Sequence, residues 1–237
     1  MGNIIEEISY KGYNIVTSYD EDCASPREWD TLGNFYSNRR SYNPDNLTIM
    51  DLGETEEERH KNLKENYLFY PVSFYEHSGI SIGAMQFGML SDLNNWGWDS
   101  GLFGFYAVRK DNKEVQSMSV EEIKKVLLNE IKIFNDYLNG QCFGYEIQNW
   151  DGDVVDSCFG YIGEEAYQQM KEEAMDYCDE HPLDVLELVL SDFDIEPLKD
   201  LFFEFNEERK ELLGLVKMLP VNENNQTIIE DLIGMLE

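Results

Sequence analysis

Residues 119–161, SVEEIKKVLLNEIKIFNDYLNGQCFGYEIQNWDGDVVDSCFGY, decide the fold, because they join a helix to a hairpin. Ser119 and Glu122 form a capping box at the start of this segment. Apolar residues then recur at spacings of three and four as far as Leu138, and Gly140 follows where a helix end is expected. The pattern predicts one amphipathic helix over residues 120–138.

The second half of the segment alternates in a different way. Two strands, at about 142–149 and 154–161, flank Asp151-Gly152, a pair that favours a tight turn between antiparallel strands. A helix followed by such a hairpin predicts an α+β protein rather than an all-helical or parallel one.

Shorter patterns on either side of this segment extend the same fold. They predict strands at 3–10, 13–19, about 29–36, 68–75 and 102–108, and a helix from Thr55 to about Asn66. A further helix is expected to begin at Glu164-Glu165 and to bury Ala166, Met170, Ala174 and Tyr177. The glycine-rich residues 77–101 predict a long ordered loop. Beyond His181-Pro182 only helical patterns follow. We therefore expect an antiparallel sheet with packed helices over 1–181, and a helical acidic C-terminal region over 182–237.

Composition bounds the class of protein. The chain has 237 residues, of which 42% are hydrophobic and 13% aromatic, so it can bury a core and is not a disordered acidic tail. The sequence has no apolar run of about 18 residues and no basic segment followed by an apolar one at its N-terminus. These observations predict a cytoplasmic protein that does not enter membranes, and the resemblance described below implies a bacterial host as its setting.

The cysteines give no metal or redox motif. Cys23, Cys142, Cys158 and Cys178 are widely spaced, with no CxxC pair. We expect reduced, structural thiols, no cofactor and no bound metal.

Negative charge is the strongest signal in the composition. The chain carries 48 acidic and 18 basic residues, a net charge of −30, and half of the acidic residues fall in residues 151–237. Such a field repels nucleic acid and anionic membranes and attracts basic surfaces. The sequence therefore predicts a basic protein or nucleoprotein complex as the partner and no direct contact with nucleic acid.

A run of acidic residues on predicted helices is the candidate partner-binding surface. Carboxylates one helical turn apart lie about 5–6 Å from one another, close to the phosphate spacing of one nucleic-acid strand. The alternative is a solvated face that keeps the protein soluble. The candidate residues are Glu164, Glu165, Glu172, Glu173, Asp176, Asp179, Glu180, Asp184, Glu187, Asp192, Asp194 and Glu196.

A small enzyme is the second hypothesis. Asp20, Asp22, His77 and Asp99 could form a carboxylate-dependent or metal-dependent site, and Ser78 beside His77 could be a nucleophile. The sequence contains no GxSxG motif of the kind that holds a nucleophilic serine. The alternative is that these residues lie in turns, where their side chains bond to the backbone. Two further acidic sets, Asp20-Glu21-Asp22 and Asp151 with Asp153 and Asp156, lack the spacing of an EF-hand.

The third hypothesis is a regulator that binds a host protein through its aromatic loops, in which the negative charge plays no part in binding. The pair Arg39-Arg40 stands near Tyr36 and Tyr42, and in so acidic a chain we expect it to pair with carboxylates of the protein itself.

Several segments occur in a fixed order over about residues 10–165. They are Ser25-Pro26-Arg27-Glu28-Trp29-Asp30-x-Leu32-Gly33, Arg39-Arg40-x-Tyr42, Tyr75-x-His77-Ser78-Gly79-Ile80, Trp98-Asp99-Ser100-Gly101, Tyr137-Leu138-x-Gly140, Phe143-Gly144-Tyr145 and Asp156-Ser157-Cys158-Phe159-Gly160-Tyr161-x-Gly163. In these the chain resembles a family of uncharacterised proteins of bacteriophages and conjugative elements from Gram-positive bacteria, with Phe159 in place of the usual Trp. The resemblance implies a setting rather than a chemistry. By analogy with acidic accessory proteins of such elements, some of which are DNA mimics, it suggests an anti-restriction or anti-CRISPR inhibitor without catalytic activity.

Overall fold

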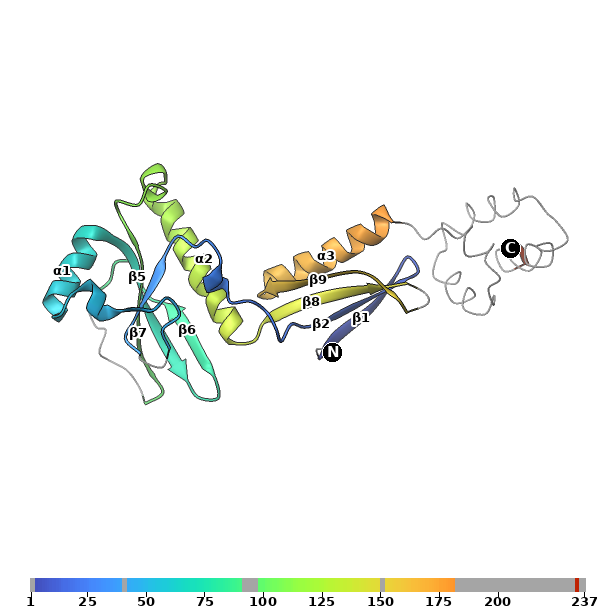
Figure 1. The fold of residues 1–237 in the computed structure, drawn as a ribbon, viewed down its shortest axis with the longest axis horizontal. Coiled ribbons are helices and arrows are strands. Elements are labelled where there is room, and N and C mark those ends of the chain that lie inside the picture. Colours follow the sequence, from blue (N-terminus) through green and yellow to red (C-terminus); the bar gives the residue numbers. More distant parts are fainter. Residues whose placement is uncertain (1–2, 40–41, 91–97, 150–151, 182–232, 235–237) are drawn as a thin grey trace. The chain divides into compact units, whose positions relative to one another are not determined.

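The computed structural model describes residues 3–39, 42–90, 98–149, 152–181 and 233–234 (Figure 1). Its contacts divide these residues into two compact units. Unit 1 contains residues 3–18, 144–149, 152–159 and 168–181, and unit 2 contains residues 19–39, 42–90, 98–143 and 160–167. The predicted helical region from residue 182 lies outside the described residues, apart from residues 233–234.

A five-stranded sheet forms the centre of unit 2, in the order β4-β3-β7-β5-β6. Its strands are β3 (Asn34–Ser37), β4 (Leu47–Thr48), β5 (Tyr67–Glu76), β6 (Ile80–Ala84) and β7 (Ser100–Arg109). All neighbours are antiparallel except β3 and β4, which are parallel. Gly104 in β7 has φ 152°, and a Cβ there would lie 2.0 Å from the carbonyl oxygen of Tyr36 in β3, so only glycine fits this close crossing.

Each face of this sheet is covered by a helix. On one face α2 (Val120–Leu138) buries Ile123, Leu127, Ile131 and Phe134 in a cluster with Phe35, Phe103 and Tyr106. On the other face of the sheet, α1 (Glu56–Asn66) buries Leu63 in a second cluster with Tyr67, Phe69 and Phe105. Short 3-10 helices at Pro26–Glu28, Ile49–Leu52 and Val115–Ser117 complete the unit.

A four-stranded sheet, in the order β1-β2-β8-β9, forms most of unit 1. Its strands are β1 (Ile4–Tyr10), β2 (Tyr13–Tyr19), β8 (Cys142–Gln148) and β9 (Val154–Ile162), and α3 (Glu164–Glu180) lies along one face (Figure 1). Tyr13 and Ile15 of β2 and Ile147 of β8 are buried, as are Met170, Ala174 and Cys178 of α3. The phenol of Tyr13 donates a hydrogen bond to the carbonyl of His181, 2.8 Å away, which fixes the end of the helix.

The predicted α+β class is therefore confirmed for the described residues. Three local predictions are wrong. Residues 77–101 are not a continuous loop, because β6 pairs with β5 within them. The strand expected from residue 29 begins only at Asn34, because the N–H of Trp29 closes a 3-10 helix and those of Leu32 and Gly33 donate to Glu130 of α2. The buried face of α3 includes Tyr167 and Cys178, whereas Tyr177, predicted to be buried, is only half-buried.

Among the described residues, no helix is long and apolar enough to cross a membrane.

Candidate functional site

The described half of the predicted acidic surface lies on α3, and every one of its residues is exposed. These residues are Glu164, Glu165, Glu172, Glu173, Asp176, Asp179 and Glu180. Their exposure follows from the helical period, because the buried positions Met170, Ala174 and Cys178 recur on the opposite side. We call the five that belong to unit 1, Glu172, Glu173, Asp176, Asp179 and Glu180, the acidic face.

Lysines neutralise only the margin of the acidic face. Lys11 pairs with Asp179 at 2.9 Å, and its ammonium holds the pKa of that carboxyl below the usual range. Lys171 turns away to pair with Glu6 of β1 at 3.4 Å. These are the only two lysines in the described part of unit 1, which also contains no arginine. Glu172, Glu173, Asp176 and Glu180 are exposed beside this margin, and Glu173 also accepts a hydrogen bond of 2.7 Å from the side-chain amide of Gln169.

Five predicted residues of the same surface, Asp184, Glu187, Asp192, Asp194 and Glu196, lie outside the described residues. So does Asp151 of the second acidic set, while Asp156 of that set accepts a hydrogen bond of 2.8 Å from the phenol of Tyr145.

The fold brings two of the four residues of the enzyme hypothesis, His77 and Asp99, onto neighbouring segments beside the end of β5 and the start of β7. His77, Ser78 and Asp99 are all exposed, and the carbonyl of Asp99 accepts the backbone N–H of Glu76. Asp20 accepts the N–H of Asp22 in a local turn, at 3.1 Å. Within the described ranges, no three His, Cys, Asp or Glu side chains lie close enough to hold a metal ion. Turn residues bonded to the backbone account for the positions of all four.

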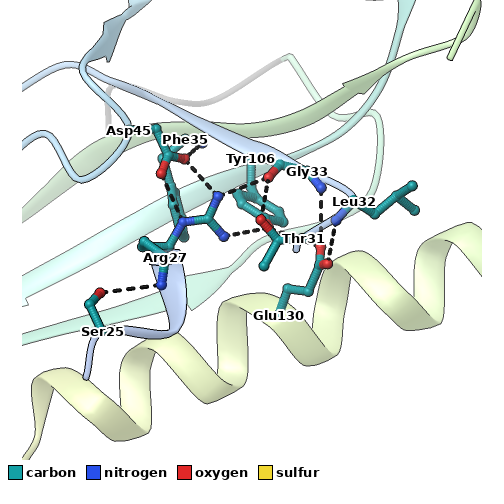
Figure 2. Close-up of polar contacts among 9 residues, drawn as sticks. All are labelled: Ser25, Arg27, Thr31, Leu32, Gly33, Phe35, Asp45, Tyr106 and Glu130. Carbon is teal, nitrogen blue, oxygen red and sulfur yellow. Dashed lines mark hydrogen bonds and ion pairs between the residues drawn. The ribbon is translucent and has the colours of Figure 1, made fainter. Parts of the chain in front are cut away.

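A buried ionic network in unit 2 was not predicted from the sequence (Figure 2). Arg27 donates two hydrogen bonds to the carboxylate of Asp45, at 2.8 and 2.9 Å, and the two side chains are 6% and 8% exposed. The same guanidinium donates to the phenol of Tyr106 at 2.9 Å and to the carbonyl of Gly33 at 2.9 Å. Burial, with the carboxylate of Glu130, raises the pKa of the Tyr106 phenol far above its ordinary value although Arg27 acts in the opposite direction, so the phenol stays protonated.

Glu130 of α2 completes the network from the other side. Its carboxylate accepts the phenol of Tyr106 at 2.9 Å and the backbone N–H groups of Leu32 and Gly33 (Figure 2). Asp45 also accepts the N–H of Phe35 at 2.6 Å. The three charged groups are thus saturated by partners of the protein itself, which identifies a structural clamp rather than an open catalytic site.

Arg39 behaves as expected of a cation in an acidic chain. It pairs with Glu76 and lies 4.1 Å from the ring centre of Phe74, while Arg40 lies outside the described residues.

A cavity of about 360 Å³ opens beside Arg39. Its other lining residues are Ser37, Asn38, Asn43, Thr48, Ile49 and Met50.

Exposed aromatic side chains gather at one end of the five-stranded sheet. Tyr75 near the end of β5 is 53% exposed, and Trp98, just before β7, is fully exposed. A hydrogen bond from the backbone N–H of Glu76 to the carbonyl of Asp99 joins the two segments that carry Tyr75 and Trp98.

Comparison of the chain with protein-family models, with curated proteins and with solved structures finds no match.

Proposed function

We propose that this chain is an acidic protein of a phage or mobile element that binds and inhibits a host defence nucleoprotein complex, of the anti-CRISPR or anti-restriction type. The acidic face of α3 occupies a basic groove that otherwise holds DNA or RNA. The observation that carries the proposal is a helix surface with five exposed carboxylates, from which Lys171 is turned away towards Glu6.

Geometry and charge both support this mode of binding. Side chains three and four positions apart on a helix are about 5–6 Å from one another, so carboxylates at 172, 173, 176 and 180 present anions at near-phosphate spacing. The net charge of −30 adds a long-range field that accelerates encounter with a basic partner.

Charge reversal tests the proposal. The triple variant Glu172→Lys, Glu173→Lys, Asp176→Lys changes three exposed side chains without touching the pair between Lys11 and Asp179. The matched control, Glu54→Lys, Glu57→Lys, Glu65→Lys, makes the same charge change on exposed positions in and before α1. A protein retained from host lysate by the wild-type chain is purified and loaded with its own labelled DNA or RNA.

The wild-type chain and the α1 control are expected to displace the nucleic acid, and the α3 variant is not. Displacement by the α3 variant at wild-type concentrations, or a ternary complex that keeps the nucleic acid, would contradict the proposal. The salt dependence gives a second measurement. A protein mimic releases few condensed counterions, so its binding should weaken less steeply with salt than that of the nucleic acid.

The exposed aromatic residues support one alternative, a regulator that binds a host protein through these loops. Tyr75→Ala with Trp98→Ala removes the aromatic surface and leaves the acidic face intact. Loss of partner binding in this double variant, with normal binding by the α3 variant, would favour the alternative.

A further inference from the structure

Strand β9 is an edge of the four-stranded sheet. Among the residues that the structure describes, its one neighbour in the sheet is β8. Six of its nine residues are exposed, namely those from Val154 to Gly160 with the exception of Asp156, and so is the preceding Asp153. Alternate backbone N–H and C=O groups of such a strand point away from the sheet, where another chain can pair with them.

The sequence of β9 lacks the usual protection against such pairing. Edge strands are commonly blunted by lysine, by proline or by several charges. VVDSCFGYI contains neither lysine nor proline, and its single charge, Asp156, accepts the phenol of Tyr145. Val154, Val155 and Phe159 are 51%, 41% and 46% exposed. Gly160, with φ 93°, interrupts the strand only towards its end.

The two faces beside this edge differ in chemistry. The ring of Phe159 lies against Gly144 of β8, where a Cβ would be 2.0 Å from it. Asp156, three positions away, therefore belongs to the opposite face, the one covered by α3. On that face the phenol of Tyr177 donates to the carbonyl of Val155 at 3.5 Å, so α3 reaches the edge strand.

Carboxylates of α3 stand on the same side as Tyr177. Glu173 lies four positions before it and Glu180 three positions after it, which places both next to it on the helix surface. The described part of unit 1 carries ten acidic residues and two lysines, and both lysines are paired with Glu6 and Asp179. This charge favours a cationic strand at the edge and opposes a second copy of a chain with net charge −30.

We propose that β9 is the docking edge for an extended basic segment of the partner, which joins the sheet as a fifth strand through backbone hydrogen bonds. Alternate lysine or arginine side chains of that segment face Glu173 and Glu180, and the β-branched side chains between them pack beside Val155 and Phe159. The inference deepens the proposed function, because it names the chemistry and the docking mode of the partner.

A nine-residue peptide of alternating lysine and valine, labelled with a fluorophore, is the probe. Two further peptides carry N-methyl groups on alternate amides, one on each edge of the strand. Edge pairing uses only one of these two sets, so one methylated peptide is expected to bind at least about tenfold more weakly and the other within about threefold of the parent. Equal affinity of both methylated peptides would overturn the proposal, because attraction by charge alone ignores the backbone.

Two measurements on the protein complete the test. Alkylation of Cys158, an exposed thiol on β9, should slow at saturating peptide while that of Cys23 is unchanged. Val155→Lys should weaken the peptide about tenfold through charge at the edge, and Leu128→Lys, at an equally exposed position on α2, should have little effect. Similar weakening by both variants, or an unprotected Cys158, would count against docking at β9.

The outcomes separate this inference from the function on which it rests. Peptide binding at β9 without displacement of nucleic acid would leave the edge site standing and remove the inhibitor proposal. Displacement of nucleic acid that Val155→Lys does not weaken would support the inhibitor proposal and remove the edge site. A dimer in sedimentation equilibrium that Val155→Lys dissociates would assign the edge to a second copy of the chain and overturn the basic partner.

Discussion

At the scale of single residues, the segment Ser25–Gly33 is explained by folding rather than by catalysis. Ser25 accepts the N–H of Arg27 and starts the 3-10 helix, and Pro26 is buried at its first position. A Cβ on Gly33 would lie 2.5 Å from the ring of Tyr106, so glycine is needed where the chain passes over it. Ser25, Pro26 and Gly33 thus hold the segment around one buried arginine, Arg27.

Arg27→Ala should therefore be among the most destabilising single changes in unit 2. It leaves the carboxylate of Asp45 buried without its cation, which costs about 3–5 kcal/mol in the free energy of unfolding. Arg109→Ala is the matched control, since its pair with Asp111 is exposed and solvent screening leaves it little effect on stability. Urea denaturation followed by tryptophan fluorescence measures both. Equal losses would show that Arg27 does not clamp the fold.

The thiols should react in an order set by burial. Cys158 is exposed, whereas burial raises the pKa of Cys142 to about 12 and that of Cys178 to about 11. At pH 8 a thiol reagent should modify Cys158 first, while Cys142 and Cys178 stay protonated and react only after unfolding. Mass spectrometry of time points identifies the sites. Early modification of Cys142 or Cys178 in folded protein would contradict the buried placement.

At the scale of elements, the fold follows the sequence pattern wherever the signal is local. The helix predicted over 120–138 is α2 to the residue, because its capping box, its apolar period and the glycine after its end all lie within residues 119–140. Strand β6 was missed because Ile80–Ala84 is short, follows Gly79 and contains Gly83, and only its pairing with β5 makes it a strand. Arg27 and Glu130 were missed for the same reason, since their partners lie far away in the chain.

The capping box of α2 gives a prediction with a defined pH range. Hydrogen bonds from the hydroxyl and the N–H of Ser119 lower the pKa of Glu122. A carboxyl whose pKa is lower in the folded state stabilises the fold above its unfolded pKa of about 4.3, and this contribution is lost as the pH falls through the folded value. Glu122→Gln should thus reduce stability at pH 7 and make little difference at pH 2.5. Thermal melts at both values test this, and an equal deficit at pH 2.5 would show that charge plays no part.

At the scale of the whole molecule, the sign and amount of charge were predictable, but its arrangement was not. Composition gave the net charge of −30, and the helical period placed Glu172, Glu173 and Asp176 on an exposed face. The pairs of Asp179 with Lys11 and of Lys171 with Glu6 needed the tertiary fold, because their partners are on β1 and the turn that follows it. These pairs decide which carboxylates remain for a partner.

So large a net charge should also limit the stability of the protein itself. Repulsion among exposed carboxylates acts over about 30 Å at 0.01 M salt but only about 8 Å at 0.15 M. Sodium chloride should therefore raise the melting temperature between these concentrations, since screening relieves more repulsion than it costs in exposed ion pairs. Each replacement of an acidic residue by lysine raises the net charge by two units, so the α3 triple variant has a net charge of −24 instead of −30. Its melting temperature should rise less with salt than that of the wild type. A wild-type melting temperature that falls with added salt would mean that attractive pairs such as Lys11 with Asp179 outweigh the repulsion.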